Sequence, residues 1–123
     1  MDVKTLARDY LDYLQKGEID KVIALFANDG LVVSPIYGTK PAQDFYTELA
    51  NDTEASVLKF DGLFEEKEGH RVALSFDYHW TLKNGKKVVF KVVDIIVLDD
   101  AFKIKKLTII YDTYISRELV KSL

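Results

Sequence analysis

Asp94 is the residue whose setting indicates chemistry most directly, because it is a carboxylate within the apolar run Val92-Val93-Asp94-Ile95-Ile96. Burial among apolar side chains disfavours the charged form, so such a carboxyl group keeps its proton. A protonated carboxyl can donate a hydrogen bond to a ligand oxygen. The alternative is a structural ion pair with Lys105 or Lys106 on the next expected strand.

The surroundings of Asp94 follow from the hairpin at Lys83-Asn84-Gly85. A three-residue loop with Gly85 in the left-handed conformation places Asp77 opposite Lys91, where their charges attract. A two-residue loop would place both charges opposite apolar or aromatic partners, so we predict the three-residue loop. One face of the hairpin then carries Asp94 as its only charge, together with Leu74, Phe76, Tyr78, Trp80, Val88, Phe90 and Val92.

His79 lies inside an expected strand, and a histidine can act as a general base near neutral pH. The predicted register places it opposite Val89, on the face away from Asp94, so we interpret it as an outer-face residue. His70 follows Gly69 in an expected turn. Two histidines on different elements, with no carboxylate at ligand spacing, predict no metal site. The sequence contains no cysteine, which excludes a thiolate nucleophile and disulfides, and no cofactor is predicted.

Three helices are expected to position these groups from the first part of the chain. Apolar residues at helical spacing predict helices over about 3–14 and 18–27, and a third that is capped by Thr39 and ends near Asn51. Tyr10 lies on the apolar stripe of the first helix and Tyr46 on that of the third. A buried phenol packs its ring and needs a partner for its hydroxyl, so each is either a core residue or a ligand contact.

Strands are expected to follow the helices. A short strand at Leu31-Val32-Val33 ends at Ser34-Pro35, and serine beside proline is typical of a turn. Four longer strands are predicted over roughly 55–65, 70–82, 86–98 and 102–115. Helices followed by a meander predict one α+β domain over 1–123, with the helices packed on a curved antiparallel sheet. Apolar residues on the outer face, including Val89, Val93 and Ile95, favour a homodimer.

Composition limits the possible partners. The 123 residues are 48% hydrophobic and 30% charged, which is typical of one soluble globular domain. A net charge of -3 provides no attraction to phosphate backbones or anionic lipid, so neither nucleic acid nor a membrane is an expected partner. The N-terminal residues form no targeting signal, and no apolar run approaches the ~20 residues of a membrane span. We therefore expect a cytoplasmic protein.

The run from Tyr10 to Asp20, followed by Ile23 to Asp29, resembles the opening of the nuclear transport factor 2-like superfamily, in its SnoaL-like and ketosteroid-isomerase-like branch. The likeness covers nearly the whole chain and continues through Ser34-Pro35, Gly38-Thr39, Phe45-Tyr46, residues 74–78 and Asp94. It implies a cone of curved sheet, closed by helices over a pocket, and often a dimer. Members of this superfamily include isomerases, cyclases, dehydratases, hydrolases and binding or transport proteins, so the fold alone does not choose a function.

The resemblance also implies roles for single residues. Tyr10 matches the tyrosine of the isomerase oxyanion hole, Asp94 its protonated aspartic acid, and Tyr46 a supporting tyrosine. In ketosteroid isomerase itself, the matching aspartic acid stays neutral and donates a hydrogen bond, and the role expected for Asp94 is taken from that example. The isomerase base would fall at Ser34, and a serine hydroxyl cannot abstract a carbon-bound proton unaided. The predicted ligand contacts are Ser34, Tyr46, Phe76, Tyr78, Trp80 and Phe90, which could equally be plain core.

Two functions compete on this basis. The first is a pocket for a small, mostly apolar ligand, as a binding protein or as a lyase or isomerase that acts on a carbonyl or hydroxyl group. The second is a non-catalytic binding or protein-interaction module of the transport-factor type, which the missing base at Ser34 favours.

Overall fold

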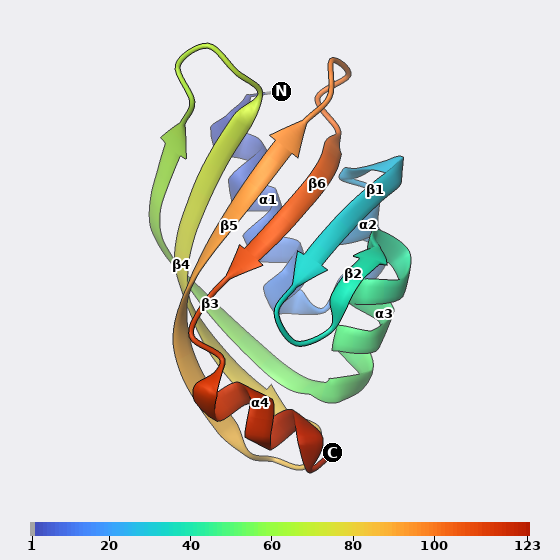
Figure 1. Ribbon diagram of the computed structural model, residues 1–123, viewed down its shortest axis with the longest axis vertical. Coiled ribbons are helices and arrows are strands. Elements are labelled where there is room, and N and C mark those ends of the chain that lie inside the picture. The colour runs from blue at the N-terminus through green and yellow to red at the C-terminus, as the bar shows by residue number, and fades with distance from the viewer. Residues whose placement is uncertain (1) are drawn as a thin grey trace.

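A curved sheet of six strands holds three helices against one of its faces (Figure 1). The computed structural model describes residues 2–123. Its elements are α1 (Val3–Lys16), α2 (Ile19–Ile23), β1 (Phe26–Ser34), β2 (Gly38–Pro41), α3 (Ala42–Asp52), β3 (Thr53–Glu65), β4 (Arg71–Leu82), β5 (Lys87–Leu98), β6 (Ile104–Ile110) and α4 (Tyr114–Lys121). This is the expected α+β architecture, in which helices precede most of the sheet.

The ends of α1 are set by its sequence. The Asp2 side chain accepts a hydrogen bond from the Thr5 N–H at 2.7 Å, which caps the first turn. Gly17 ends the helix in the left-handed conformation, with a φ of 73°. The buried stripe of α1 comprises Leu6, Ala7, Tyr10, Leu11 and Leu14. The first predicted helix is therefore confirmed.

The second and third helices differ from their predicted bounds. The helix expected over 18–27 ends at Ile23, because Phe26 already pairs with Ile104 of β6. The third helix begins at Ala42, with Pro41 as its N-cap residue. Thr39, predicted as the cap, lies instead in β2, where it pairs with Val33.

The sheet is mixed, which corrects the prediction of a purely antiparallel one. Its strand order is β2-β1-β6-β5-β4-β3, and β1 runs parallel to β6 while the other neighbours are antiparallel. The last predicted strand, over 102–115, is also too long. It ends at Ile110, and the Asp112 carboxylate then accepts the Tyr114 N–H at 3.0 Å, where α4 begins.

The predicted β4–β5 register is confirmed. Asp77 pairs with Lys91, and its carboxylate lies 3.0 Å from the lysine Nζ, while Leu74 pairs with Asp94. Gly85 has a φ of 84°, and its N–H donates to the Leu82 carbonyl at 2.8 Å, which closes the three-residue loop. Asp94 therefore lies on the face that meets the helices.

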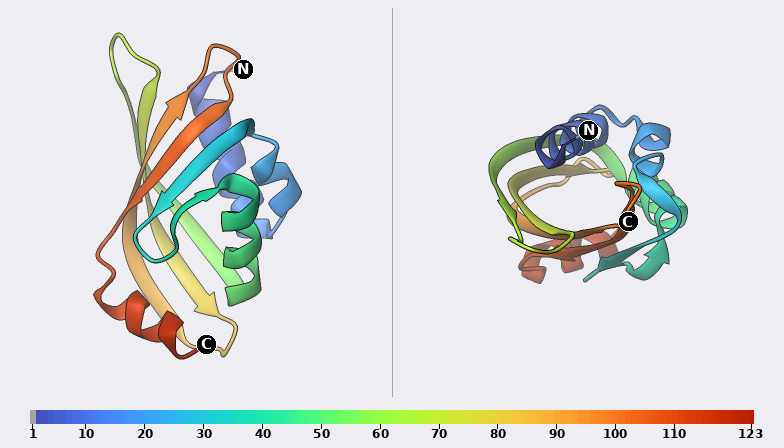
Figure 2. Two further views of the ribbon diagram at one scale, coloured as in Figure 1. Left: turned by 45° about the vertical axis from the view of Figure 1, so that its right-hand side comes forward. Right: turned by 90° about the horizontal axis from the view of Figure 1, so that it is seen from above.

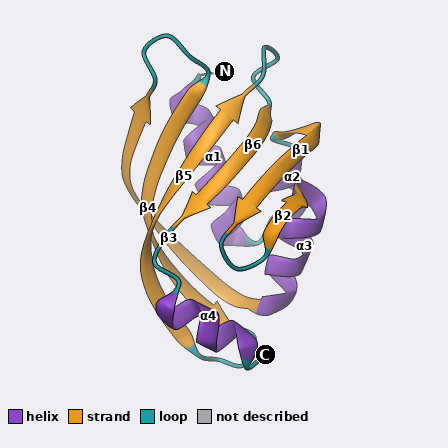
Figure 3. Ribbon diagram, in the orientation of Figure 1, coloured by secondary structure: helices purple, strands orange, loops and turns teal. Residues whose placement is uncertain are grey.

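Seen from above, the sheet curves into an open ring, and α1, α2 and α3 lie along one part of its rim (Figure 2). The α4 helix lies apart from these three, at the end of the molecule opposite the N-terminus (Figure 3). Within residues 2–123, no helix combines the length and apolar character needed to cross a membrane.

Candidate functional site

Three polar residues from three different elements meet in the core. Tyr10 comes from α1, Tyr46 from α3 and Asp94 from β5, and all three side chains are buried. The Tyr10 and Tyr46 hydroxyl oxygens lie 2.8 Å apart, and either can be the donor. Each helix contributes its tyrosine from the apolar stripe that packs on the sheet, so amphipathic helix packing is what brings the hydroxyls together.

Asp94 is a carboxyl group in an apolar site. It is 1% exposed, and its Oδ1 has no hydrogen-bond partner within residues 2–123. Burial raises the pKa of Asp94 well above its ordinary value. The alternative ion pair is wrong, because Asp94 faces Ile109 on β6 while Lys105 and Lys106 are exposed. A raised pKa favours the protonated form, which can donate a hydrogen bond.

The surrounding tyrosines also keep their protons. Burial is the main cause that raises the pKa of Tyr10 and of Tyr46 well above the ordinary value, and the nearby Asp94 raises both further. Burial likewise raises the pKa of Tyr78 to about 12, although its hydroxyl lies 3.0 Å from the Ser56 Oγ, a contact that lowers the pKa. These pKa shifts favour the protonated forms of Asp94 and the three tyrosines, and each protonated form is a hydrogen-bond donor.

A cavity of about 40 Å³ adjoins these groups. Six residues from the prediction line it together with Asp94, namely Tyr10, Ser34, Phe76, Tyr78, Trp80 and Phe90. The structure places Tyr46 behind Tyr10, fully buried, rather than on the cavity wall. Sites that enclose drug-sized ligands measure about 300–1,000 Å³. In this conformation the cavity has room for little more than one water-sized group.

Ser34 forms a turn, as its place before Pro35 indicated. Its Oγ accepts hydrogen bonds from the N–H groups of Ile36 and Tyr37, each at 3.2 Å. The Ser34 oxygen is therefore used as an acceptor by the backbone. No general base is present at this position, where the resemblance to ketosteroid isomerase would place one.

Among the wall residues that were not predicted, two are tyrosines, Tyr37 and Tyr111. The Tyr37 hydroxyl donates to the Asp52 carboxylate at 2.6 Å, and burial is the first cause of its raised pKa. Tyr111 stacks on Phe90 with ring centroids 4.3 Å apart. The sequence signal for Tyr37 was an aromatic residue just after the Ser34-Pro35 turn, and for Tyr111 an aromatic residue near the end of the strand predicted over 102–115. That signal did not show which way the rings point.

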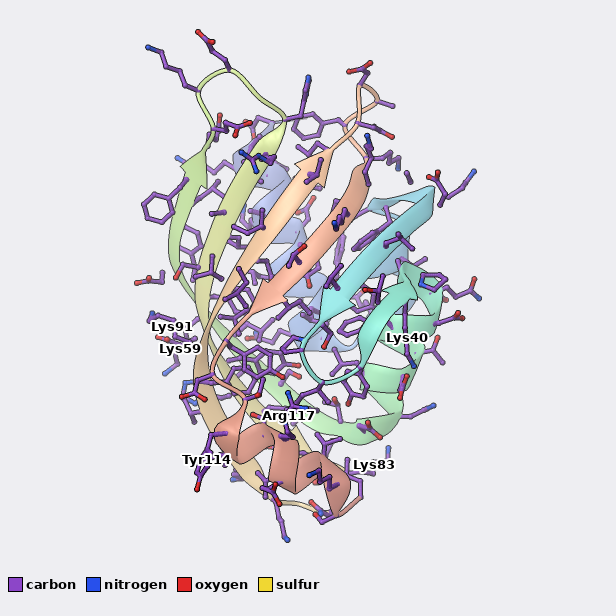
Figure 4. The ribbon with its side chains drawn as sticks, viewed as in Figure 1. Lys40, Lys59, Lys83, Lys91, Tyr114 and Arg117 are labelled. Carbon is purple, nitrogen blue, oxygen red and sulfur yellow. The ribbon has the colours of Figure 1, made fainter. Side chains whose placement is uncertain are left out.

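The α4 helix contacts the turn that follows Ser34. Arg117 donates to the Pro35 carbonyl at 3.2 Å, next to Ser34. Figure 4 shows Arg117 turned toward the body of the molecule and Tyr114 pointing away from it. Leu119 and Val120 pack against the core. The cavity therefore lies beside a turn that α4 holds.

His79 lies away from this site, as predicted. It pairs with Val89 on the outer face of the sheet, while its neighbour Tyr78 faces the cavity. No cluster of three potential metal ligands is found among residues 2–123.

Comparison with known proteins gives a family match and several similar structures. A family model described as a SnoaL-like domain matches residues 7–106. TerC, co-crystallised with polyporic acid, superposes with a TM-score of 0.80 at 17% identity, covering 95% of this chain and 96% of that one. An NTF2-like protein of unknown function from Burkholderia pseudomallei gives a TM-score of 0.79 at 19% identity, covering 96% and 94%.

A third structure is a hypothetical protein from Catenulispora acidiphila with a ketosteroid isomerase-like fold, in complex with trimethylamine. It gives a TM-score of 0.76 at 12% identity, covering 87% of this chain and 85% of that one. At these identities the likeness shows the fold alone. No curated protein matches the chain.

Proposed function

Since the chain belongs to the SnoaL-like domain family, we propose that it binds a small, mostly apolar molecule through one carbonyl or hydroxyl oxygen. The observation that carries this proposal is the buried Asp94 Oδ1, which has no partner within residues 2–123. A buried polar atom without a partner costs about 1–3 kcal/mol. A ligand oxygen in the adjoining cavity would remove that cost, and the rest of the ligand requires the cavity to widen beyond its present volume of about 40 Å³.

The donors suit an oxygen that gains negative charge. Their raised pKa values favour the protonated forms of Asp94 and Tyr10, and in those forms both can donate to a carbonyl without placing a charge in the cavity. Preorganised donors in a dry site are worth more to a developing oxyanion than to a neutral carbonyl. The same donors would serve a lyase or isomerase that acts next to a carbonyl, which is the narrower form of the proposal.

The cavity wall also offers an acceptor. The Tyr37 proton is directed at Asp52, which leaves the lone pairs of the Tyr37 oxygen for another donor. A ligand that carries a carbonyl at one end and a hydroxyl at the other would satisfy Asp94 and Tyr37 together. We therefore extend the proposal to hydroxyl-bearing carbonyl compounds.

Catalysis by proton abstraction has no evident base. Asp94 is the only carboxylic acid among the described residues that line the cavity, and its raised pKa favours the protonated form, which cannot accept a proton. Asp52 reaches the cavity through the Tyr37 hydroxyl. These observations favour binding over turnover, as in the alternative of a non-catalytic binding module.

Thermal unfolding with matched aromatic probes tests the proposal, because a ligand bound only by the native state raises stability. We expect 4-hydroxyacetophenone to raise the Tm most, acetophenone less, and ethylbenzene least. The order should collapse in Asp94→Leu, which removes the donor. Equal shifts for acetophenone and ethylbenzene in the unchanged protein, or no shift with any probe, would contradict the proposal.

A further inference from the structure

A hollow of about 500 Å³ lies between α1 and the edge strand β3. We call it the α1–β3 groove. It shares no lining residue with the cavity beside Asp94, so it is a separate site. Its volume falls within the range of about 300–1,000 Å³ that is usual for small-molecule sites.

The floor of the α1–β3 groove is apolar. Ala7 and Leu11 of α1 form its buried side, and Leu58 and Leu63 of β3 are partly buried opposite them. Phe60 is 61% exposed although it lies on the side of β3 that faces the helix, opposite Phe76. Removing apolar surface from water is favourable, so an occupant with an apolar chain would be stabilised on this floor.

The rim of the groove is cationic at one end. Lys4 and Arg8 lie about one turn apart on the same side of α1. Neither forms an ion pair within residues 2–123. Asp12, one turn further along, is 3.1 Å from Lys16. The charge available to an occupant is therefore positive and lies near the start of the helix.

The other end of the groove is polar but uncharged. Gln15 Oε1 accepts the Leu58 N–H at 2.7 Å, which ties the helix to the free edge of β3. From Lys4 to Gln15 the helix rises about 16 Å at 1.5 Å per residue. With carbon–carbon bonds of about 1.5 Å in a zigzag, that length suits a chain of about a dozen carbons.

We propose that the α1–β3 groove binds a medium-chain fatty acid as its carboxylate, with the head group at Lys4 and Arg8. The chain lies along the apolar floor and covers Phe60. Both the sign of the charge and the length of the chain follow from the groove, so both can be tested against matched probes.

Isothermal titration calorimetry with dodecanoate, below its micelle concentration at pH 7.5, tests this assignment. We expect saturable one-to-one binding that weakens at least about tenfold, or 1.4 kcal/mol, in the double variant Lys4→Glu/Arg8→Glu. The double variant Lys86→Glu/Lys87→Glu makes the same change in net charge at the β4–β5 hairpin and should bind as the unchanged protein does. Hexanoate and dodecyltrimethylammonium should bind much more weakly than dodecanoate.

Amide chemical shifts locate the bound chain independently of these variants. Dodecanoate should move the signals of residues 4–15 and 58–63, and leave those of 90–94 in place. Shifts centred on 90–94 would assign the fatty acid to the Asp94 cavity and overturn the proposal. Absence of binding, or equal affinity in Lys4→Glu/Arg8→Glu, would overturn it too. If Phe60→Ser dissociated a dimer, the groove would be a contact between copies, which also excludes the proposal.

Discussion

The hydroxyl oxygens of Tyr10 and Tyr46 lie 2.8 Å apart, although the two residues belong to different helices, α1 and α3. Both side chains are buried, so each hydroxyl depends on the other for a partner. The pair fixes the position of the Tyr10 oxygen on the cavity wall.

Replacement of Tyr10 by phenylalanine should lower the free energy of unfolding by about 1–3 kcal/mol, because it leaves the Tyr46 hydroxyl buried without a partner. The Tyr10→Phe/Tyr46→Phe double variant should lose less than the sum of the two single changes. Urea unfolding measures these values. Tyr13→Phe, on the same helix but with no hydrogen bond to its hydroxyl from any described residue, is the control and should change stability by less than about 0.5 kcal/mol. A strictly additive double variant would contradict the pairing.

Asp94 should make the protein less stable as the pH rises. Its folded pKa lies above the unfolded value of about 3.9, so the native state holds the proton more tightly than the unfolded state does. Stability from this group is complete below the unfolded pKa and is lost as the pH rises through the folded pKa.

Asp94→Asn cannot ionise, so it should be neutral or stabilising at pH 8 and should flatten this part of the stability curve. Urea melts of both proteins at pH 5 and pH 8 measure the difference. Asp77→Asn, which changes an exposed carboxylate beside Lys91, should retain the pH dependence of Asp94. A large loss of stability in Asp94→Asn at both pH values would refute the neutral acid.

The unchanged protein should show negligible isomerisation of a small β,γ-unsaturated ketone, because Ser34 supplies no carboxylate. A general base contributes about 10²–10⁴-fold, so Ser34→Asp should raise turnover. The gain in turnover should lie near the lower end of this range. An aspartate at this position would accept the Ile36 and Tyr37 N–H groups, and such hydrogen bonds lower the pKa of the carboxyl group, which makes it a weaker base. Absorbance of the conjugated product follows the reaction, with Ser34→Asn as the control. Robust turnover by the unchanged protein would show that another residue acts as the base.

The outer face of the sheet should form a homodimer. Val57, His79 and Val89 lie in one row across β3, β4 and β5, and Val89 is 60% exposed. Lys59 and Lys91, which flank Asp77 in the next row, lie on the same side of the sheet (Figure 4). Apolar rows of this kind on an open sheet are typical of a self-complementary contact.

Size measurement at micromolar concentration should therefore give about twice the 14.1 kDa of one chain. Val89→Glu should yield monomers, because it places a charge in the centre of the contact. Phe60→Glu introduces the same charge on the helix-facing side and should leave the dimer intact. A clean monomer in the unchanged protein would refute the contact.

Local sequence signals were sufficient to predict the β4–β5 hairpin and, with it, the side of the sheet on which Asp94 lies. The left-handed Gly85 and the opposite charges of Asp77 and Lys91 favour the same register within a short stretch of chain. Two consistent local preferences determine a register because a shift of one residue would turn every side chain to the other face.

Other features depend on contacts that the sequence does not display. The parallel β1–β6 pair joins Phe26 to Ile104, and no turn connects those segments. Residues 111–115 are rich in aromatic and β-branched side chains, so they resemble a continued strand, and α4 was missed. Helical spacing placed Tyr46 on a buried face, but it carried no information on depth, and Tyr46 lies behind Tyr10 instead of on the wall.

The parallel β1–β6 pair also sets the time at which the site is completed during synthesis. Ser34 ends β1, whose longer neighbour in the sheet is β6, while Asp94 lies on β5 on the other side of β6. Pairing of β1 with β6 is slow because the two strands are far apart in the sequence, and it cannot start until β6 has left the ribosome. The cavity therefore cannot close before β6 has emerged, however early the helices and the β3–β4 hairpin are made.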